Sequence, residues 1–251
     1  MASSRWRLSG VACAAISLMF VGPFQTGFAQ SAETPAQRCS WEGWLPPQTA
    51  RERVRRAAHL DPSITAVLIA RTRAEDKNGR MLAAEKLGAA QDSGSLRALL
   101  DLTADRDPMV QEAAIRSLGR MGASSALPVI AHFSSSPNAH LRQGAVWALG
   151  QLQNPAAIGA VVTASADTSK HVRNEATWAL GLIGGKTAAT RVKNLARDVD
   201  PHVRLAAVCS LDMIHDTGDP QTRQILAVLG RDSVELVRQT ARWAATRLEP
   251  R

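Results

Sequence analysis

Three histidines, His140, His171 and His202, are spaced 31 residues apart. Imidazole side chains at regular intervals could in principle hold a metal ion. A zinc ion needs ligand atoms at about 2.1 Å, and therefore roughly 3.5 Å from one another, whereas neighbouring helices pack about 8–10 Å apart. No Asp or Cys recurs beside the histidines to complete a ligand set. We therefore expect solvated histidines in first helical turns, and no metal or cofactor.

The segment Leu180–Thr187 reads Leu-Gly-Leu-Ile-Gly-Gly-Lys-Thr, which is close to a phosphate-binding loop. It has Leu180 where the first glycine of that motif belongs, and it follows a predicted helix instead of a strand, so we exclude nucleotide binding. The sequence also has no Gly-x-Ser-x-Gly, His-Glu-x-x-His or Cys-x-x-Cys motif. We assign no catalytic residue, and these absences favour a non-enzymatic protein.

The elements that carry these residues follow a 31-residue period, which is marked by the leucines Leu87, Leu118, Leu149, Leu180 and Leu211. A fixed period of this length is typical of solenoids built from small supersecondary units. In each copy, Asp-Pro or another polar residue opens a helix with one apolar stripe, and a second apolar segment lies between successive copies. No strand-type alternation occurs. We predict an all-α superhelix of about six stacked helical hairpins.

The recurrent word Asp-Pro-x-Val-Arg-x-x-Ala-x-x-Ala-Leu-Gly is approached at Asp107–Gly119 and at Lys170–Gly181. It resembles the HEAT-like repeat of the phycobilisome-lyase type. The resemblance covers residues 62–249 and implies an α-α superhelix of the HEAT-like solenoid class. It does not imply one function, because this scaffold hosts many unrelated roles.

Enzymes with similar repeats suggest an alternative function, a lyase or oxidoreductase activity. Deoxyhypusine hydroxylase holds two irons with His-Glu pairs that follow the Val-Arg word. The corresponding pairs in this chain read Asn174-Glu175, Gln111-Glu112, Gln143-Gly144 and Leu205-Ala206. The resemblance therefore does not extend to the iron ligands. Bilin-attaching lyases share the repeat, but no pattern here marks a chromophore site.

A row of arginines, Arg142, Arg173, Arg204 and Arg238, follows the first apolar residue of each second helix. The row lies about 100° around the helix from that residue and faces the next unit, near Asp-rich turns such as those with Asp105, Asp107, Asp198 and Asp200. We interpret the row as a structural ladder of charge-assisted hydrogen bonds between repeats. The alternative is an anion-binding row.

A row of indoles, Trp147, Trp178 and Trp243, occupies one place in the repeat, which Glu85, Arg116 and Cys209 hold in other copies. This place points away from the first helices, toward the expected concave wall of the superhelix. The indoles either form a recognition strip or only cover neighbouring helices, and the sequence leaves both open. The strip would be flanked by His140, His171, His202, Gln143 and Gln151. A further row, Gly119, Gly150 and Gly181, fits helix ends.

The chain has 251 residues, 45% of them apolar, and a formal net charge of +8. Residues 1–29 have the features of a signal peptide: Arg5 and Arg7, then the apolar stretch Leu8–Val21, then Gly27-Phe28-Ala29. We therefore expect a periplasmic or secreted protein. No other segment is long and apolar enough to span a bilayer.

Residues 30–48, which contain Pro35, Pro46 and Pro47, are expected to form a flexible leader. Residues 49–61 follow as a basic helix with Arg51, Arg53, Arg55 and Arg56. We interpret it as the polar cap of the solenoid, and an anion patch is the alternative. Cys39 and Cys209 are expected to stay unpaired, because a disulfide requires the leader to fold back over several repeats.

The sequence thus predicts an exported, non-enzymatic scaffold that binds a protein or peptide along its concave face. The alternatives are the enzymatic activity above and, more weakly, polyanion binding by the basic helix. No specific nucleic acid is expected as a partner, because export separates the protein from the chromosome. The sequence leaves the partner, the curvature and the oligomeric state open.

Overall fold

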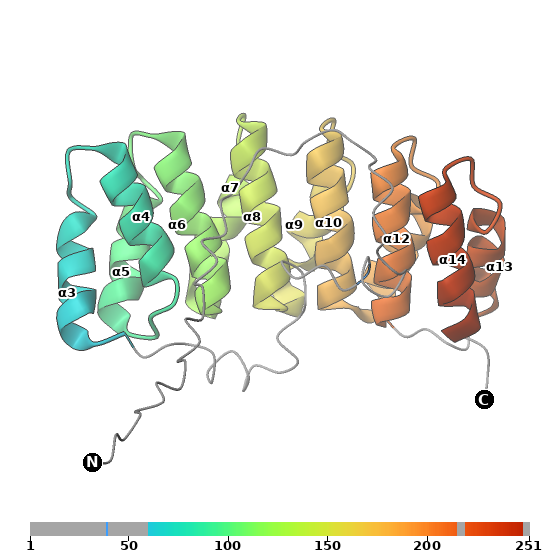
Figure 1. Ribbon diagram of the computed structural model, residues 1–251, viewed down its shortest axis with the longest axis horizontal. Helices are drawn as coiled ribbons and strands as arrows, with labels where there is room; N and C mark the ends of the chain where they lie inside the picture. The colour runs from blue at the N-terminus through green and yellow to red at the C-terminus, as the bar shows by residue number, and fades with distance from the viewer. Residues whose placement is uncertain (1–38, 40–59, 215–218, 248–251) are drawn as a thin grey trace, which may run out of the picture. The chain divides into compact units, whose positions relative to one another are not determined.

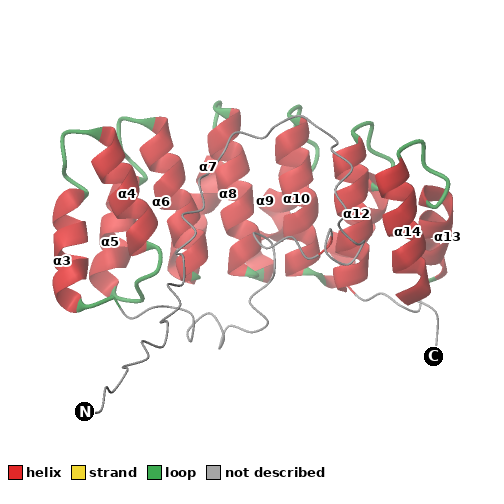
Figure 2. Ribbon diagram, viewed as in Figure 1, coloured by secondary structure: helices red, strands yellow, loops and turns green. Residues whose placement is uncertain are grey.

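The computed structural model describes Cys39 and residues 60–214 and 219–247. These residues belong to one compact unit, residues 33–251, and every regular element among them is helical (Figure 2). None of the helices in these ranges is long and apolar enough to cross a membrane. The predicted all-α fold class is therefore confirmed. The predicted signal peptide, most of the leader, and the basic helix with Arg51, Arg53, Arg55 and Arg56 lie outside the described residues.

The described helices form six antiparallel pairs, each of which is a first helix followed by a second helix (Figure 1). The pairs are α3 (Pro62–Arg71) with α4 (Lys77–Leu87), α5 (Ser93–Leu102) with α6 (Pro108–Met121), α7 (Leu127–Phe133) with α8 (Ala139–Leu152), α9 (Ile158–Ala164) with α10 (Lys170–Ile183), α11 (Gly185–Leu195) with α12 (Pro201–Ile214), and α13 (Pro220–Leu229) with α14 (Glu235–Arg247). Short 3-10 turns, Ser124–Ala126 and Pro155–Ala157, lead into α7 and α9. The repeat unit is therefore the predicted helical hairpin.

Polar residues at the helix starts explain where the helices begin. Asp107, for example, precedes Pro108, and its Oδ1 accepts a hydrogen bond of 2.9 Å from the amide of Met109. At the C-terminal ends of α6 and α8, Gly122 and Gln153 adopt the left-handed conformation, with φ of 71° and 49°. A non-glycine residue pays strain energy for this conformation. Because Gly122 and Gln153 are the residues that end the two helices, α6 and α8 extend past Gly119 and Gly150 of the glycine row.

The second helices contact one another in sequence order from α4 to α14, and Figure 1 shows them side by side in one layer. The five periodic leucines are fully buried between the two layers of helices. The glycine row lies where successive second helices meet. A Cβ atom on Gly119 would lie 2.7 Å from the Cα of Ala148, and one on Gly150 would lie 2.9 Å from the Cα of Ala179. The row thus lies in the last turns of α6, α8 and α10, near the helix ends as predicted, and its glycines let two backbones approach.

Candidate functional site

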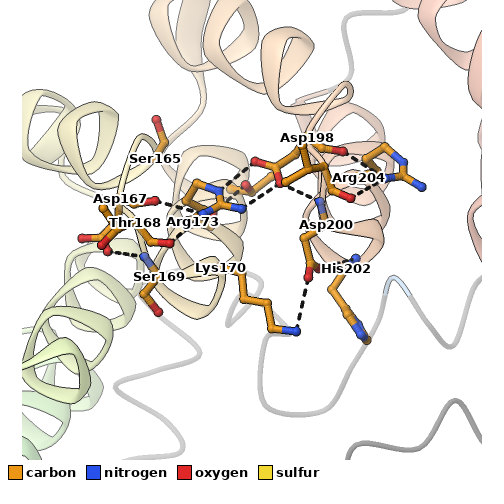
Figure 3. Close-up of polar contacts among 12 residues, drawn as sticks. Ser165, Asp167, Thr168, Ser169, Lys170, Arg173, Asp198, Asp200, His202 and Arg204 are labelled. Carbon is orange, nitrogen blue, oxygen red and sulfur yellow. Dashed lines mark hydrogen bonds and ion pairs between the residues drawn. The ribbon is translucent and has the colours of Figure 1, made fainter.

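Arginines join four of the second helices, α4, α8, α10 and α12, to the turn that precedes the next second helix. Figure 3 shows Arg173 with its partner Asp198, and Arg204 of the next second helix. In Arg173, Nε and Nη2 donate hydrogen bonds of 2.8 and 3.0 Å to the two carboxylate oxygens of Asp198. Its Nη1 donates to the carbonyl oxygens of Asp167 and Thr168. The same geometry recurs in three further pairs, Arg80 with Asp105, Arg142 with Asp167, and Arg204 with Asp232. Such two-point pairing fixes both distance and orientation.

Each aspartate of the ladder also holds its own turn. Asp198 Oδ1 accepts a hydrogen bond of 2.9 Å from the amide of Asp200. Burial opposes ionisation of Asp198, but the hydrogen bonds from Arg173 and from this amide outweigh it and lower the pKa of the carboxyl. The described arginines of the ladder donate hydrogen bonds to carboxylate and carbonyl oxygens of the protein itself. We therefore interpret the row as structural and not as an anion-binding site.

The ladder has two departures from regularity. In one rung, that is, one arginine–aspartate position of the ladder, Gln111 replaces the arginine and Ser136 replaces the aspartate. Gln111 Nε2 donates a hydrogen bond of 2.7 Å to the carbonyl oxygen of Asp105. Ser136 Oγ accepts a hydrogen bond from the amide of Asn138. In the last repeat, Arg238 contacts the carbonyl of Asp232 and the carboxylate of Glu235. Sequence reasoning missed Arg80 and the partner aspartates Asp167 and Asp232. A recurring arginine-to-aspartate spacing of 25 residues was the signal.

The three periodic histidines lie at exposed positions in the first turns of α8, α10 and α12. The backbone amides of His140 and His202 donate to the capping side chains of Asn138 and Asp200, both at 2.9 Å. Among the described residues, no group of three or more His, Cys, Asp or Glu side chains could hold a metal ion. The geometry therefore places these histidines as surface residues of the second-helix layer.

The indole row does not form an open wall. Trp178 is only 7% exposed and packs with Ala206 and Cys209 of the next second helix. Trp147 and Trp243 are half-buried against the core, and each carries a guanidinium over its ring: Arg116 at 5.2 Å and Arg247 at 5.0 Å. The prediction that Trp178 lies on an open recognition strip was therefore wrong. Small residues on α12 leave room for its ring, which is buried there.

The predicted flanking glutamines differ from each other in exposure. Gln151 is buried, whereas Gln143 is half-buried on the second-helix layer. Gln151 was therefore wrongly placed on an open face. Of the predicted strip, Trp147, Trp243 and Gln143 are half-buried and the three histidines are exposed. Trp147 and Gln143 lie on neighbouring turns of α8, with His140 one turn earlier.

Cys39 and Cys209 form a disulfide with a Cα–Cα distance of 5.1 Å, so the expectation that both stay unpaired was wrong. Cys209 follows Trp178 by 31 residues and holds the same place in α12. Four helix spacings of about 8–10 Å separate α4 from α12, whereas the 21 residue steps from Cys39 to Leu60 can span about 70 Å. The chain is therefore long enough for Cys39 to reach α12. Cys39 packs against Trp178, Ala206 and Cys209, which we call the Trp178 cluster.

A polar cluster lies on the second-helix layer where α6, α8 and α10 meet. It consists of Glu112, Arg116, Gln143, Trp147 and Glu175, and we call it the α6–α10 polar cluster. Glu112 Oε1 accepts a hydrogen bond of 2.9 Å from Arg116 Nε. Glu175 is 6% exposed. Sequence reasoning weighed Glu175 only as half of an iron pair and missed its role in this cluster.

The pKa of Glu175 is raised to about 8, chiefly by burial, and the negative charge of Glu112 acts in the same direction. The charge of Arg116 and a hydrogen bond with Gln143 act in the opposite direction but do not restore the ordinary value. At neutral pH, Glu175 therefore carries a proton. A buried carboxyl that titrates near neutrality, beside a charged pair and an indole, is able to exchange its proton for another positive charge.

A family model described as HEAT repeats matches the chain over residues 65–134, 128–199 and 164–246. No curated protein sequence matches it. Among solved structures, the complex of CpcE and CpcF of phycocyanin lyase from Nostoc sp. PCC7120 is similar, with 21% identity, a TM-score of 0.56, and coverage of 70% of this chain and 74% of that chain.

Two engineered proteins are similar as well. One has a TM-score of 0.56 and 19% identity, and the match covers 74% of this chain and 96% of the other. The second is a designed armadillo repeat protein in complex with the peptide (KR)4, with a TM-score of 0.55, 19% identity, and coverage of 72% and 98%. Likeness at these identities concerns the fold alone. The family model, in contrast, spans most of the sequence, with the periodic leucines and the turns of the arginine–aspartate ladder inside its matches. The chain belongs to the HEAT repeat family.

Proposed function

We propose that this protein is an exported, non-enzymatic scaffold that binds a protein or peptide partner on its second-helix layer. The observation that carries the proposal is the α6–α10 polar cluster. It places ionisable and aromatic side chains on a surface whose repeats are otherwise held together by leucines, glycines and the arginine–aspartate ladder. Groups that the fold does not need are candidates for binding.

The disulfide supports the location of the partner site. Cys39 lies on the Trp178 cluster, between α10 and α12, so that part of the layer is already in contact with the chain's own residues. The part around Trp147, Gln143 and His140 is half-buried or exposed. We therefore assign partner binding to the α6–α10 polar cluster together with His140, and not to the whole indole row.

The disulfide also supports export, because such bonds persist in oxidising compartments and are rare in the cytosol. Export is tested by fractionating cells and sequencing the N-terminus of the mature protein, which we expect at Gln30. Recovery of the full-length chain from the cytosol, with reduced cysteines, would contradict it.

Partner binding is tested by affinity capture from the cell envelope, followed by mass spectrometry. Gln143→Ala with Trp147→Ala should abolish capture of the specific partner. The matched control is Gln239→Ala with Trp243→Ala, because these residues hold the same places in α14. Equal capture by both double variants would refute the site. Far-UV circular dichroism checks that helicity is unchanged.

Two similar structures support such a role. The designed armadillo protein was solved with a bound peptide, and the lyase of Nostoc is itself a complex of two proteins.

A further inference from the structure

We infer that the α6–α10 polar cluster binds a basic side chain, a lysine or an arginine of the partner, in exchange for the proton of Glu175. The inference rests on the proposed function and deepens it, because it names the chemistry of the recognised group. It is carried by the place of Glu175 in the repeat, by the room that Gly144 leaves, and by the balance of charge in the cluster.

Glu175 breaks the pattern of its own repeat position. In the inner repeats the equivalent residues are Ala113, Gly144 and Ala206, all of them small and buried, whereas the outer helices α4 and α14 have Leu82 and Thr240. In the inner repeats a methyl group or a hydrogen atom is therefore sufficient for packing at this place. Burial of a carboxyl group there opposes folding unless the group is satisfied. The fold gives no reason for this carboxyl, which points to a ligand.

Gly144 allows the two carboxyls of the cluster to converge across α8. A Cβ atom at Gly144 would lie 2.9 Å from Cγ of Glu112, so the side chain of Glu112 lies directly over this glycine. The charge of Glu112 in turn acts on Glu175 from α6. An alanine at 144, the residue found at 113 and 206, would push Glu112 away.

The cluster contains two carboxyl groups and one cationic side chain, so full ionisation of both carboxyls would require a second cation. Glu112 and Glu175 supply the carboxyls. Arg116, from α6, is the cation that acts on Glu175, and it is already bonded to Glu112 and stacked over Trp147. Gln143, from α8, contributes a neutral amide. At neutral pH a proton on Glu175 supplies the missing positive charge. A ligand ammonium or guanidinium can replace that proton as the second cation of the cluster.

Exchange of a proton for a cation makes binding depend on pH. Below the pKa of about 8 of Glu175, each bound basic group releases up to one proton, so affinity rises with pH and levels off above about 8. For complete exchange, the affinity increases about ninefold between pH 6 and pH 7. Because the whole chain carries a net charge of +8, non-specific attraction of a basic peptide is disfavoured.

The test is isothermal titration of the full-length mature protein with an eight-residue peptide of alternating lysine and glycine. The control peptide has the same sequence with acetylated lysines, which removes the charge. Titrations at pH 6, 7 and 8, in buffers of different ionisation enthalpy, give both the affinity and the number of protons released. Wild type should bind only the charged peptide, with the pH slope above and release of close to one proton at pH 7.

Glu175→Gln imitates the protonated side chain and should fold normally, but it should lose both proton release and the pH dependence of binding. Glu85→Gln, at an exposed glutamate of α4, is the control and should behave like wild type. Equal proton release by wild type and Glu175→Gln, or absence of binding to the charged peptide, would overturn the inference. If capture of the envelope partner still requires Gln143 and Trp147, the proposed function survives that failure.

Discussion

The arginine–aspartate ladder can be tested with an exception that the chain itself contains. One rung has Gln111 and Ser136 in place of the charged pair, so the scaffold accepts both replacements when they occur together. In the rung of Arg173 and Asp198, Arg173→Gln alone removes two hydrogen bonds to the carboxylate, of 2.8 and 3.0 Å. It leaves Asp198 ionised and without its counter-ion.

Removal of one partner of a buried ion pair costs about 3–5 kcal/mol. The side chains of Arg173 and Asp198 remain 15% and 10% exposed, and Asp198 keeps the hydrogen bond from the amide of Asp200. We therefore expect Arg173→Gln to lower the free energy of unfolding by about 2–3 kcal/mol. Addition of Asp198→Ser removes the charge left without a partner, and the double variant should recover about 1–2 kcal/mol of that loss.

The assay is urea denaturation at pH 7, followed by far-UV circular dichroism, of wild type, both single variants and the double variant. The pKa of Asp198 is lowered in the folded state, so the pair stabilises the fold above the ordinary aspartate pKa of about 3.9 and loses this effect as the pH falls through the folded-state value. The differences between variants should therefore shrink in acid. If the losses of the single variants simply add in the double variant, the two side chains do not act as a pair.

Four further substitutions test three other parts of the structure by the same denaturation assay. Cys39→Ser should lower the free energy of unfolding by at most about 5 kcal/mol, which is the chain-entropy estimate for a loop of 170 residues. A variant as stable as wild type would contradict the disulfide, and so would a variant whose stability still depends on a thiol reductant. Gly150→Ala should destabilise by about 1–3 kcal/mol, because its Cβ would meet the backbone of the next second helix. Gly159→Ala, where the space is open, should be neutral or stabilising by up to about 1 kcal/mol, and equal effects at the two glycines would contradict this reasoning. Glu175→Gln should match wild type in stability at pH 4 and exceed it at pH 8. The carboxyl of Glu175 has a pKa of about 8 in the folded state against an ordinary value of 4.5, so wild type loses stability as the pH rises from the lower value to the higher one; parallel pH profiles would contradict this burial.

Much of the fold was predictable because it depends on local and periodic information. The 31-residue spacing of the leucines places one buried side chain in each repeat, and the capping aspartates mark helix starts such as that at Asp107. The orientation of the arginine row also follows from the helical period, since Arg173 and Arg204 keep one angle relative to the apolar stripe. Their partners were harder to assign, because the choice between Asp198 and Asp200 depends on the path of the turn.

The candidate site was less predictable, because its members come from three helices. Whether Trp178 is open or covered depends on the side chains that α12 presents opposite it, and Ala206 and Cys209 are small. Glu112 and Glu175 belong to different repeats, and only the approach of α6 and α10 across Gly144 brings their charges into interaction. No local pattern encodes such a distance.

The sequence by itself determined the repeat, the helical hairpin, the buried leucines and the orientation of the arginine row, because all of these follow from period and amphipathicity. The tertiary structure alone decided which indole is covered, which carboxyl is protonated, and that Cys39 reaches Cys209 across 170 residues. These properties depend on the space and charge that neighbouring helices leave, and a single helix contains no information about its neighbour's surface.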